Sequence, residues 1–399
     1  MNILTISTRF YPDESGIAKQ VYLISKYLSK KNKIINVTCN PKSSLFYKRV
    51  VNDNFKIYYL PLKPPGINAR FLKLVKFFFQ FYVLAMIKSV SIIRKEKIDI
   101  IHSHSPAPSG FIAFSLKKFF RIPYFYTIHG IEKILKIIHL LDFKFTVKYS
   151  DETLVVSKQI EIHLRENFGL DGLRWFSNGI DINSYYHAKN EKEKDKFIKK
   201  LNLNSILKME DFIISYIGYM IFWQKVKGMI DFLVAFKKFI EKILDKERRK
   251  HIKLIFIGKG KYSETLLRKV EELKLKNNVI YCGYRDDIHT ILAISDLLAL
   301  VSYIEGSPLV ILEAMASKVP CLGSSVGDIP FMINNSGYLV KPGESKEIIK
   351  NLKDFYNMSD VERKAMSLSA YHRVKDNFSI KIIGKRLVNL YKETLRNRA

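Results

Sequence analysis

A segment with two glutamates, Glu305 and Glu313, is the part of the sequence best suited to binding a ligand that carries hydroxyl groups and negative charge. Glu305 ends an apolar, strand-like run, Gly306 and Ser307 form a turn, and Pro308 suits the first position of a helix. Glu313 then falls inside that helix, where its carboxylate can accept hydrogen bonds from the two hydroxyls of a ribose. Taken alone, either glutamate is more typical of a solvated helix residue, so the prediction depends on the whole arrangement.

The turn before this helix predicts an anion-binding site. The first N–H groups of a helix have no acceptor within it, and the helix dipole is positive at that end. Such N–H groups commonly bind phosphate. The expected donors are the backbone N–H groups of Gly306, Ser307, Leu309 and Val310.

These residues must be positioned by strands and helices that the apolar pattern predicts. Short, continuous apolar runs alternate with longer segments of helical spacing, which indicates an α/β fold with parallel sheets covered on both faces. A charged, apolar-poor stretch at 185–209 interrupts the alternation, which then restarts. We therefore expect two doubly wound, Rossmann-like domains, 1–185 and 186–375, that face a central cleft, and a terminal helix in 376–399 that packs back toward the first domain.

Ligands of open parallel sheets bind beyond the carboxyl ends of the strands, where loops lead into helices. Loops that follow predicted strands are therefore the places to look for binding residues. The strands and helices expected around the candidate residues are strands 2–7, 98–102, 124–128, 212–217 and 297–301 and helices 17–29, 70–94, 229–242 and 308–317.

Further short motifs occur along the chain, none of them decisive alone. They are Phe10-Tyr-Pro-Asp-Glu-Ser-Gly, Ile98-Asp-Ile-Ile-His-Ser-His, Tyr126-Thr-Ile-His-Gly, Lys227-Gly, Ile257-Gly-Lys-Gly and Val326-Gly-Asp-Ile-Pro. In this order, and together with the two glutamates, they resemble the retaining glycosyltransferases of family 4, which have the GT-B fold. The resemblance covers nearly the whole chain. It implies an N-terminal domain that binds the acceptor and a C-terminal domain that binds the nucleotide sugar.

The resemblance implies a role for each matching residue. Gly16 lets the backbone approach the donor diphosphate, because a Cβ there would occupy ligand space. Lys227 neutralises the departing diphosphate, Glu313 binds the ribose and Glu305 binds the transferred sugar. His129 lies beside the reacting anomeric carbon, with a histidine that caps its own loop as the alternative. The donor is also held by the turn and helix start at Gly306, Ser307, Pro308 and Leu309.

Some positions depart from the family pattern. The family has Gly-Arg where this sequence has Gly218-Tyr219, so a fixed charge at the diphosphate is lost, and Lys225 is the candidate substitute from the same loop. Lysine is a point charge, whereas arginine offers a bidentate fork, so the substitution is incomplete. Asp328 and Phe331 also stand at unusual positions. These departures put the identity of the donor in question more than the fold.

The implied reaction moves a sugar from a nucleoside diphosphate sugar, UDP- or GDP-linked, to a hydroxyl of a glycan or lipid-linked glycan, with retention of the anomeric configuration. Surface polysaccharide or glycoconjugate synthesis uses such transfers. No D-x-D triplet for a metal-bound diphosphate occurs in the sequence, which agrees with catalysis without a metal or other cofactor. His102 and His104 share a strand face without an evident third ligand, so we expect strand-end packing or acceptor-side lining rather than a metal site.

Three other functions fit parts of the sequence. A glycosidase could use Glu305 and Glu313 as an acid–base pair, because their spacing allows the separation of about 5–10 Å that such carboxylates need. A sugar-nucleotide epimerase shares the fold. The net charge of +29 would also fit a polyanion-binding protein, but no nucleic-acid-binding motif supports that function. A codon bias toward lysine is an alternative cause of the charge. We expect no nucleic-acid partner.

Residues 61–100 combine a long apolar run with eight basic and two acidic side chains. Such a helix either lies on an anionic membrane surface or packs on a sheet with its lysines in solvent, and the sequence leaves both open. Its most apolar part, Phe77 to Ile87, is shorter than the roughly 20 residues of a spanning helix, so we expect no span. The start of the chain predicts a buried strand rather than a signal peptide, and three separated cysteines indicate reduced thiols. We therefore expect a cytoplasmic protein, with docking to the cytoplasmic face of the membrane as an option.

Overall fold

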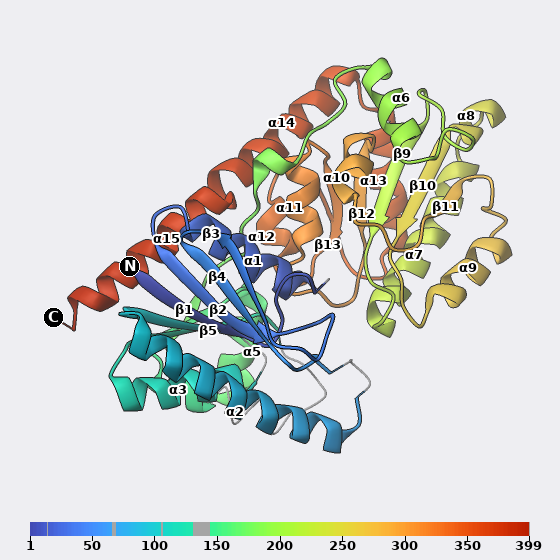
Figure 1. The fold of residues 1–399 in the computed structure, drawn as a ribbon. Coiled ribbons are helices and arrows are strands. Elements are labelled where there is room, and N and C mark those ends of the chain that lie inside the picture. The colour runs from blue at the N-terminus through green and yellow to red at the C-terminus, as the bar shows by residue number, and fades with distance from the viewer. Residues whose placement is uncertain (14, 66–68, 105–106, 131–143, 399) are drawn as a thin grey trace. The chain divides into compact units, whose positions relative to one another are not determined.

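Two sheets, each in its own unit of the chain, carry the alternation of strands and helices (Figure 1). The computed structural model describes residues 1–399 apart from 14, 66–68, 105–106, 131–143 and 399. The N-terminal unit comprises Met1–Gly179 together with Ile380–Ala399, and the C-terminal unit comprises Ile180–Ser379. The chain passes from one unit to the other after Gly179 and again after Ser379, a few residues from the expected boundaries at 185 and 375. A β-bridge between Ile180 and Ser379 joins the two crossing segments.

The sheet of the N-terminal unit has the strand order β3-β4-β2-β1-β5-β6-β7-β8 and is parallel except for β3, which runs antiparallel to β4. Five of its eight strands are buried at every position or at all but the first, as expected for a sheet covered on both faces. The strands are β1 (Asn2–Ser7), β2 (Lys33–Cys39), β3 (Tyr47–Asn52), β4 (Phe55–Leu60), β5 (Ile100–His104), β6 (Tyr124–Ile128), β7 (Glu152–Val155) and β8 (Leu173–Trp175).

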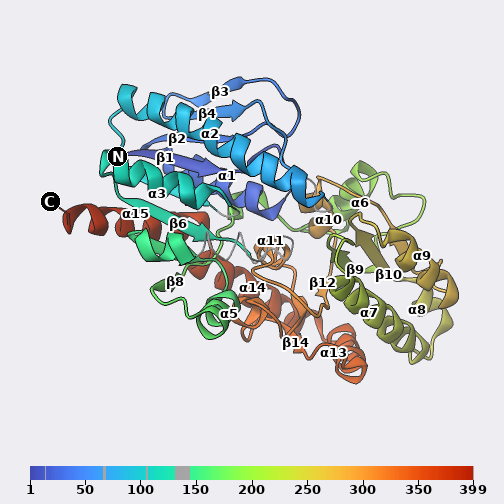
Figure 2. The ribbon, with the colours of Figure 1, turned by 90° about the horizontal axis from the view of Figure 1, so that it is seen from below.

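Helices cover both faces of this sheet, because successive strand residues point to opposite sides. Leu4 joins a core with the helices α2 and α3, whereas its neighbour Ile3 joins a core with α1 and α15. Figure 2 shows α2 and α3 beside the strands. The helices are α1 (Gly16–Leu28), α2 (Phe71–Lys95), α3 (Ser109–Phe120), α5 (Lys158–Phe168) and α15 (Ile380–Arg396).

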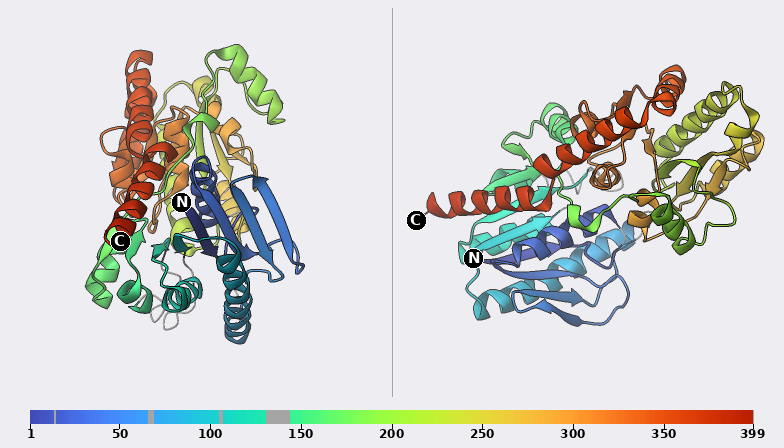
Figure 3. Two further views of the ribbon diagram at one scale, coloured as in Figure 1. Left: turned by 60° about the vertical axis from the view of Figure 1, so that its left-hand side comes forward. Right: turned by 90° about the horizontal axis from the view of Figure 1, so that it is seen from above.

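The C-terminal helix α15 is part of the N-terminal unit, where it packs on α1 (red in Figure 3). Gly384 is needed at this contact, since a Cβ there would lie 2.2 Å from the ring of Tyr27. Tyr391 is fully buried, and its ring meets that of Phe125 at 4.8 Å. The last helix of the sequence therefore completes a core that the first strands begin.

Helix α2 corrects one expectation from the sequence. It runs for 25 residues without interruption, and by length and composition alone it could cross a membrane. The expectation that this segment is too short considered only Phe77 to Ile87, the most apolar part of the helix. The side chains of α2 that are buried in the N-terminal unit include Phe81, Ala85 and Ile92.

The sheet of the C-terminal unit is parallel, with the order β11-β10-β9-β12-β13-β14. Numbered from its first strand this is 3-2-1-4-5-6, the order of dinucleotide-binding folds, with a switch point between β9 and β12. The strands are β9 (Phe212–Ile217), β10 (Ile252–Ile257), β11 (Val279–Tyr281), β12 (Leu297–Leu300), β13 (Cys321–Ser324) and β14 (Tyr338–Val340). The helices are α6 (Glu191–Lys200), α7 (Trp223–Glu241), α8 (Lys246–Lys250), α9 (Ser263–Glu272), α10 (Ile288–Ala293), α11 (Leu309–Ala316), α12 (Ile329–Ile333), α13 (Ser345–Asn357) and α14 (Asp360–Asn377).

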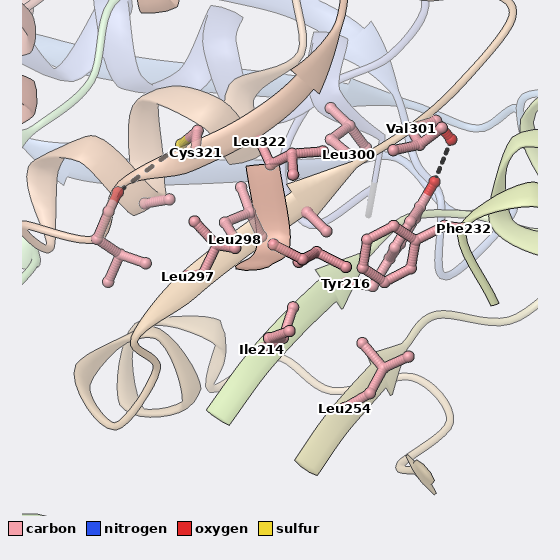
Figure 4. Packing of buried hydrophobic residues seen from close by; sticks show 14 of the residues in the cluster. Ile214, Tyr216, Phe232, Leu254, Leu297, Leu298, Leu300, Val301, Cys321 and Leu322 are labelled. Carbon is pink, nitrogen blue, oxygen red and sulfur yellow. Dashed lines mark hydrogen bonds between the residues drawn. The ribbon is translucent and has the colours of Figure 1, made fainter. Parts of the chain in front are cut away.

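The core of this unit fixes the two strands that border the switch point (Figure 4). Ile214 and Tyr216 of β9 pair with Leu297 and Ala299 of β12, and the Tyr216 hydroxyl donates a hydrogen bond to the carbonyl of Val301. Burial raises the pKa of the Tyr216 phenol, and the nearby Glu305 carboxylate raises it further. The core thus extends to the strand ends at which the candidate residues lie.

Candidate functional site

Both groups of candidate residues in the C-terminal unit follow strands of the switch point. The loop after β9 leads into α7, which carries Lys225 and Lys227, and the loop after β12 carries Glu305 and leads into α11. The sequence placed Lys225 in a loop and started the helix at 229, but α7 begins at Trp223. Gly228 lets α7 approach the strand end, because a Cβ there would lie 2.2 Å from the carbonyl oxygen of Val301.

Glu305 and Lys225 form an ion pair, with 2.7 Å between Lys225 Nζ and Glu305 Oε2. The Glu305 side chain is 5% exposed and that of Lys225 is 29% exposed. A buried carboxylate needs such a partner, because removing a charge from water is costly. Lys225, expected at the diphosphate, is thus the counter-ion of the glutamate expected to bind the sugar.

Lys227 lies elsewhere, because residues two apart on a helix point in different directions. Its ammonium group is 4.1 Å from the centre of the Tyr303 ring, a cation–π contact. The Tyr303 hydroxyl donates to Asp231 at 2.7 Å. Lys227 is exposed, so the contact leaves its ammonium group accessible to an anionic ligand.

The turn between Glu305 and α11 is held by a second loop. Gly327 has a φ of +57°, and a Cβ there would lie 2.5 Å from the carbonyl oxygen of Gly306. The backbone N–H of Asp328 donates to that same oxygen at 2.8 Å. Pro308 is the residue before α11 rather than its first residue, with an extended ψ of 113°, and it provides no side-chain cap. The first N–H groups of α11, beginning at Leu309, have no acceptor within the helix.

Glu313 is buried within α11, with 5% of its surface exposed. Tyr185 hydrogen-bonds to its carboxylate. Burial raises the pKa of the Tyr185 phenol well above its usual value, and the charge of Glu313 raises it further. Sequence reasoning missed Tyr185, which it treated only as the end of a domain, because no local pattern links it to a glutamate so far along the chain.

Three histidines lie together at the strand ends of the N-terminal unit. His104 Nδ1 is 3.1 Å from His129 Nε2, and the rings of His102 and His104 stack at 4.2 Å. His102 is held by Tyr391 at 2.5 Å and by Thr127 at 2.7 Å. The grouping arises because β5 and β6 are adjacent parallel strands, so the residues at their carboxyl ends meet.

Burial lowers the pKa of all three imidazoles, because a protein interior disfavours their charged form. The pKa falls to about 3 for His102 and to about 4 for His129, and it lies well below the usual value for His104. The group is therefore neutral at neutral pH. His129 can accept or donate a hydrogen bond but does not supply a positive charge.

Gly16 is the first residue of α1, directly after the loop that follows β1. It is exposed, and its neighbour Ser15 caps the helix by accepting a hydrogen bond from the N–H of Ala18. The start of α1, like that of α11, follows a parallel strand, but it has a side-chain cap that α11 lacks. Whether a Cβ at Gly16 blocks a ligand stays a prediction.

Among the described residues, no group of three or more histidine, cysteine, aspartate or glutamate side chains could hold a metal ion. Both ring nitrogens of His102 bind protein hydroxyls, which fits the expected packing role. The three cysteines carry free thiols.

Comparisons with known proteins match the two halves of the chain separately. Residues 15–184 match the family described as Glycosyltransferase Family 4, and residues 196–373 match the family described as Glycosyl transferases group 1. Together the two matches span most of the sequence.

Individual proteins show the same likeness. N-acetyl-alpha-D-glucosaminyl L-malate synthase of Bacillus anthracis is 28% identical over 321 residues, 78% of each chain. UDP-Gal:alpha-D-GlcNAc-diphosphoundecaprenol alpha-1,3-galactosyltransferase of Escherichia coli is 24% identical over 377 residues, 91% of this chain and 90% of that protein. The solved structure of sucrose-phosphate synthase from Thermosynechococcus elongatus superimposes with a TM-score of 0.80 at 17% identity, covering 100% of both chains, and so shares the fold.

Proposed function

Because the chain belongs to glycosyltransferase family 4 and has its GT-B fold, we propose that it transfers a hexose-like sugar from a UDP- or GDP-linked donor to a hydroxyl of a glycan or lipid-linked glycan. The proposal includes retention of the anomeric configuration and catalysis without a metal. The observation that carries it is the α11 region, where an uncapped helix N-terminus is followed by a buried glutamate that a tyrosine holds.

The diphosphate is the group for which the C-terminal unit offers positive charge. Negative charge grows on the diphosphate as the sugar leaves, so positive charges and N–H groups that already point at the diphosphate lower the barrier to transfer. The exposed ammonium of Lys227 and the N–H groups at the start of α11 supply them. Glu313 lies one turn further along the helix, where its buried carboxylate can accept hydrogen bonds from the ribose hydroxyls.

Glu305 has a proposed role at the transferred sugar. A carboxylate has about four acceptor positions, so it can bind a sugar hydroxyl while it keeps its ion pair. Lys225 fixes the orientation of the carboxylate and offsets its charge near an anionic donor. Lys225 therefore acts on the donor through Glu305 rather than by direct contact with the diphosphate.

His129 has a proposed role as a neutral hydrogen-bonding group beside the reacting carbon. Its lowered pKa and its contact with His104 keep the ring uncharged and oriented. In the account usual for this family, the departing phosphate oxygen takes the proton of the acceptor hydroxyl, so His129 need not titrate during the reaction.

The acceptor is proposed from the relatives. The name of the Escherichia coli protein includes a diphosphoundecaprenol-linked acceptor, and that of the Bacillus anthracis protein includes L-malate. The Escherichia coli protein is matched over a larger share of this chain, so we propose a lipid-linked glycan as the acceptor class.

Thermal-shift measurements with UDP-, GDP-, ADP- and CMP-sugars test the donor site. A ligand that binds the native state raises the Tm, so one nucleotide family is expected to stabilise the protein. Transfer to lipid-linked acceptors is then followed by mass spectrometry. The NMR signal of the anomeric proton in the product reports whether the anomeric configuration is retained. Turnover that persists in EDTA is expected. Absence of any nucleotide-dependent shift at millimolar concentration would contradict the donor site.

A further inference from the structure

The first ten residues of α2, Phe71–Gln80, form a surface that the fold of the N-terminal unit does not explain. Seven of them are exposed and only Leu74 is buried. Among the exposed side chains, Phe71 is 62%, Leu72 80% and Phe79 68% accessible. The later part of the same helix supplies its other buried side chains. We call residues 71–80 the exposed half of α2.

The arrangement of these side chains follows from helical geometry. Phe71, Val75 and Phe79 recur at every fourth position and so form one stripe, and Leu72 lies beside it. Lys73, Lys76 and Gln80 continue the exposed arc on the far side of Leu72. The exposed half of α2 therefore presents an apolar stripe bordered by lysines, the pattern of a helix that lies in the plane of a membrane interface.

The charge around this stripe is of one sign. Between Asp53 and Glu96 the sequence has eight basic residues and no acidic one. Lys63, Arg70, Lys73 and Lys76 are exposed, and none of them pairs with a carboxylate in the part of the chain that the structure describes. Unpaired lysines and arginines next to an apolar stripe attract anionic lipid headgroups.

The helical residues 144–149 and helix α3 extend the same surface. Phe78 of α2 meets Phe111 of α3 at 6.1 Å, and Phe145 meets Phe111 at 5.7 Å. Phe145 and Tyr149 are partly exposed, and Lys148 lies over the Tyr149 ring. Aromatic rings with adjacent lysines are the side chains that settle at the interface between headgroups and acyl chains.

The second half of α2 determines how the helix can meet a bilayer. Phe81, Ala85 and Ile92 are buried in the core that this helix shares with the sheet, and α3 lies beside it (Figure 1). To span a membrane, the helix would have to leave that core. A shallow position in the interface needs no such change, because the apolar stripe of the exposed half is already outside the core.

We propose that the exposed half of α2 docks this protein on an anionic lipid surface, with Phe71, Leu72 and Phe79 inserted below the headgroups and Lys73 and Lys76 among them. This docking extends the proposed function, because it brings the enzyme to lipid-linked acceptors on an anionic leaflet such as the cytoplasmic one. It rests on the proposed function only for that purpose, since binding to lipid can be measured without sugar transfer.

Vesicle co-sedimentation of the full chain tests the docking. Phosphatidylcholine vesicles that contain about one third phosphatidylglycerol are expected to bind the protein, and pure phosphatidylcholine vesicles much less. The variant F71S/L72S/F79S is expected to bind the anionic vesicles at least about tenfold more weakly, since it loses the inserted area. The variant K73E/K76E is expected to lose about as much affinity for the anionic vesicles. Added salt should weaken the binding of the wild type to the same vesicles.

The matched control removes exposed apolar side chains elsewhere. Leu244 and Val361 are 94% and 78% exposed in the C-terminal unit, so L244S/V361S should bind vesicles as the wild type does. All variants should keep the nucleotide-dependent thermal shift, which shows that they fold. Loss of that shift in the wild type would instead count against the proposed function and leave the docking intact.

Three outcomes would overturn the docking. One is wild-type binding that is absent or equal on neutral and anionic vesicles. Another is a triple variant that binds anionic vesicles as well as the control does. The third is a difference in oligomeric state measured by light scattering, with the wild type an oligomer and the triple variant a monomer. The apolar stripe of the exposed half of α2 would then be an interface between copies of the chain.

Discussion

The strand ends of the two units carry different chemistry. In the C-terminal unit the loops and helices that follow the strands carry the ion pair of Glu305 with Lys225, the accessible Lys227, and Glu313 with its hydrogen bond to the Tyr185 hydroxyl. Charges of both signs are therefore present there. In the N-terminal unit the ends of β5 and β6 hold three histidines that stay neutral, His102 and His104 buried and His129 half-buried. The first arrangement suits a charged nucleotide with a ribose, and the second suits a neutral, hydroxyl-bearing molecule. Similar parallel sheets thus provide different sites, because the charged side chains lie on the loops and helices that follow the strands and not on the strands.

The largest expected effect tests the charged site. In Glu313→Gln the carboxylate that is proposed to hold the ribose loses its charge but keeps its shape. We expect kcat/KM to fall at least about 100-fold, about 2.7 kcal/mol, and the nucleotide-dependent thermal shift to disappear. Glu264→Gln, at an exposed position in α9, is the control and should behave as the wild type does. A Glu313 variant that keeps both turnover and the shift would contradict the ribose role.

Lys227→Ala is the next test of the comparison. It removes an accessible charge that is proposed to act on the leaving diphosphate, so we expect kcat to fall about 10- to 100-fold. Lys238→Ala, exposed on the same helix, should leave the steady-state kinetics unchanged. If both substitutions have the same effect, general positive charge is what matters and the specific role of Lys227 is wrong.

The neutral site makes a prediction about acid. Burial lowers the pKa of His102 to about 3 and that of His129 to about 4, whereas both titrate near 6.5 in the unfolded chain. Below about pH 6.5 the unfolded state binds more protons than the native state. The free energy of unfolding therefore decreases as the pH is lowered, and the full stability is present only above about pH 6.5. We expect a loss of up to about 1.4 kcal/mol per pH unit for each histidine until its native pKa is reached.

Urea unfolding at several pH values between 7 and about 4.5 measures this loss. His129→Gln cannot titrate, so its stability should fall less steeply with pH than that of the wild type. Equal slopes for the two proteins would show that His129 does not remain neutral in the native state.

The smallest effect concerns the support of the charged site. Tyr185→Phe removes the hydroxyl that hydrogen-bonds to Glu313, and a hydrogen bond of this kind contributes about 1 kcal/mol. We expect the KM for the donor to rise about three- to tenfold while kcat changes little, since Tyr185 positions the glutamate without contacting the reacting atoms. Tyr186→Phe, at the neighbouring position, is the control. A fall in kcat alone would contradict the positioning role.

Much of the fold was predictable from the sequence. The strands Asn2–Ser7, Tyr124–Ile128 and Phe212–Ile217 have the predicted bounds, because a strand buried on both faces is a continuous apolar run. The edge strand Tyr47–Asn52 was missed, since its side chains are mostly exposed and give no such run. The family resemblance drawn from the motifs is confirmed by the matches over both halves of the chain.

The candidate site was predictable only in part. Glu305 and Glu313 could be found because their motif is local, one strand end followed by one helix. The partners of these residues could not, since Lys225 and Tyr185 reach them from other elements. The pairing of Lys225 rather than Lys227 with Glu305 depends on the rotation of α7, which is set by its packing and not by the residues near the lysines.

The sequence by itself determined the fold class, the order of the motifs and the excess of positive charge, because these depend on local periodicity and composition. Only the tertiary structure decided which side chains meet. His102 and Tyr391 are 289 residues apart, and they form a hydrogen bond because α15 returns to the first sheet. The same packing left half of α2 uncovered. Apolar residues at helical spacing predict a helix, but whether a protein core covers them depends on which elements lie beside that helix.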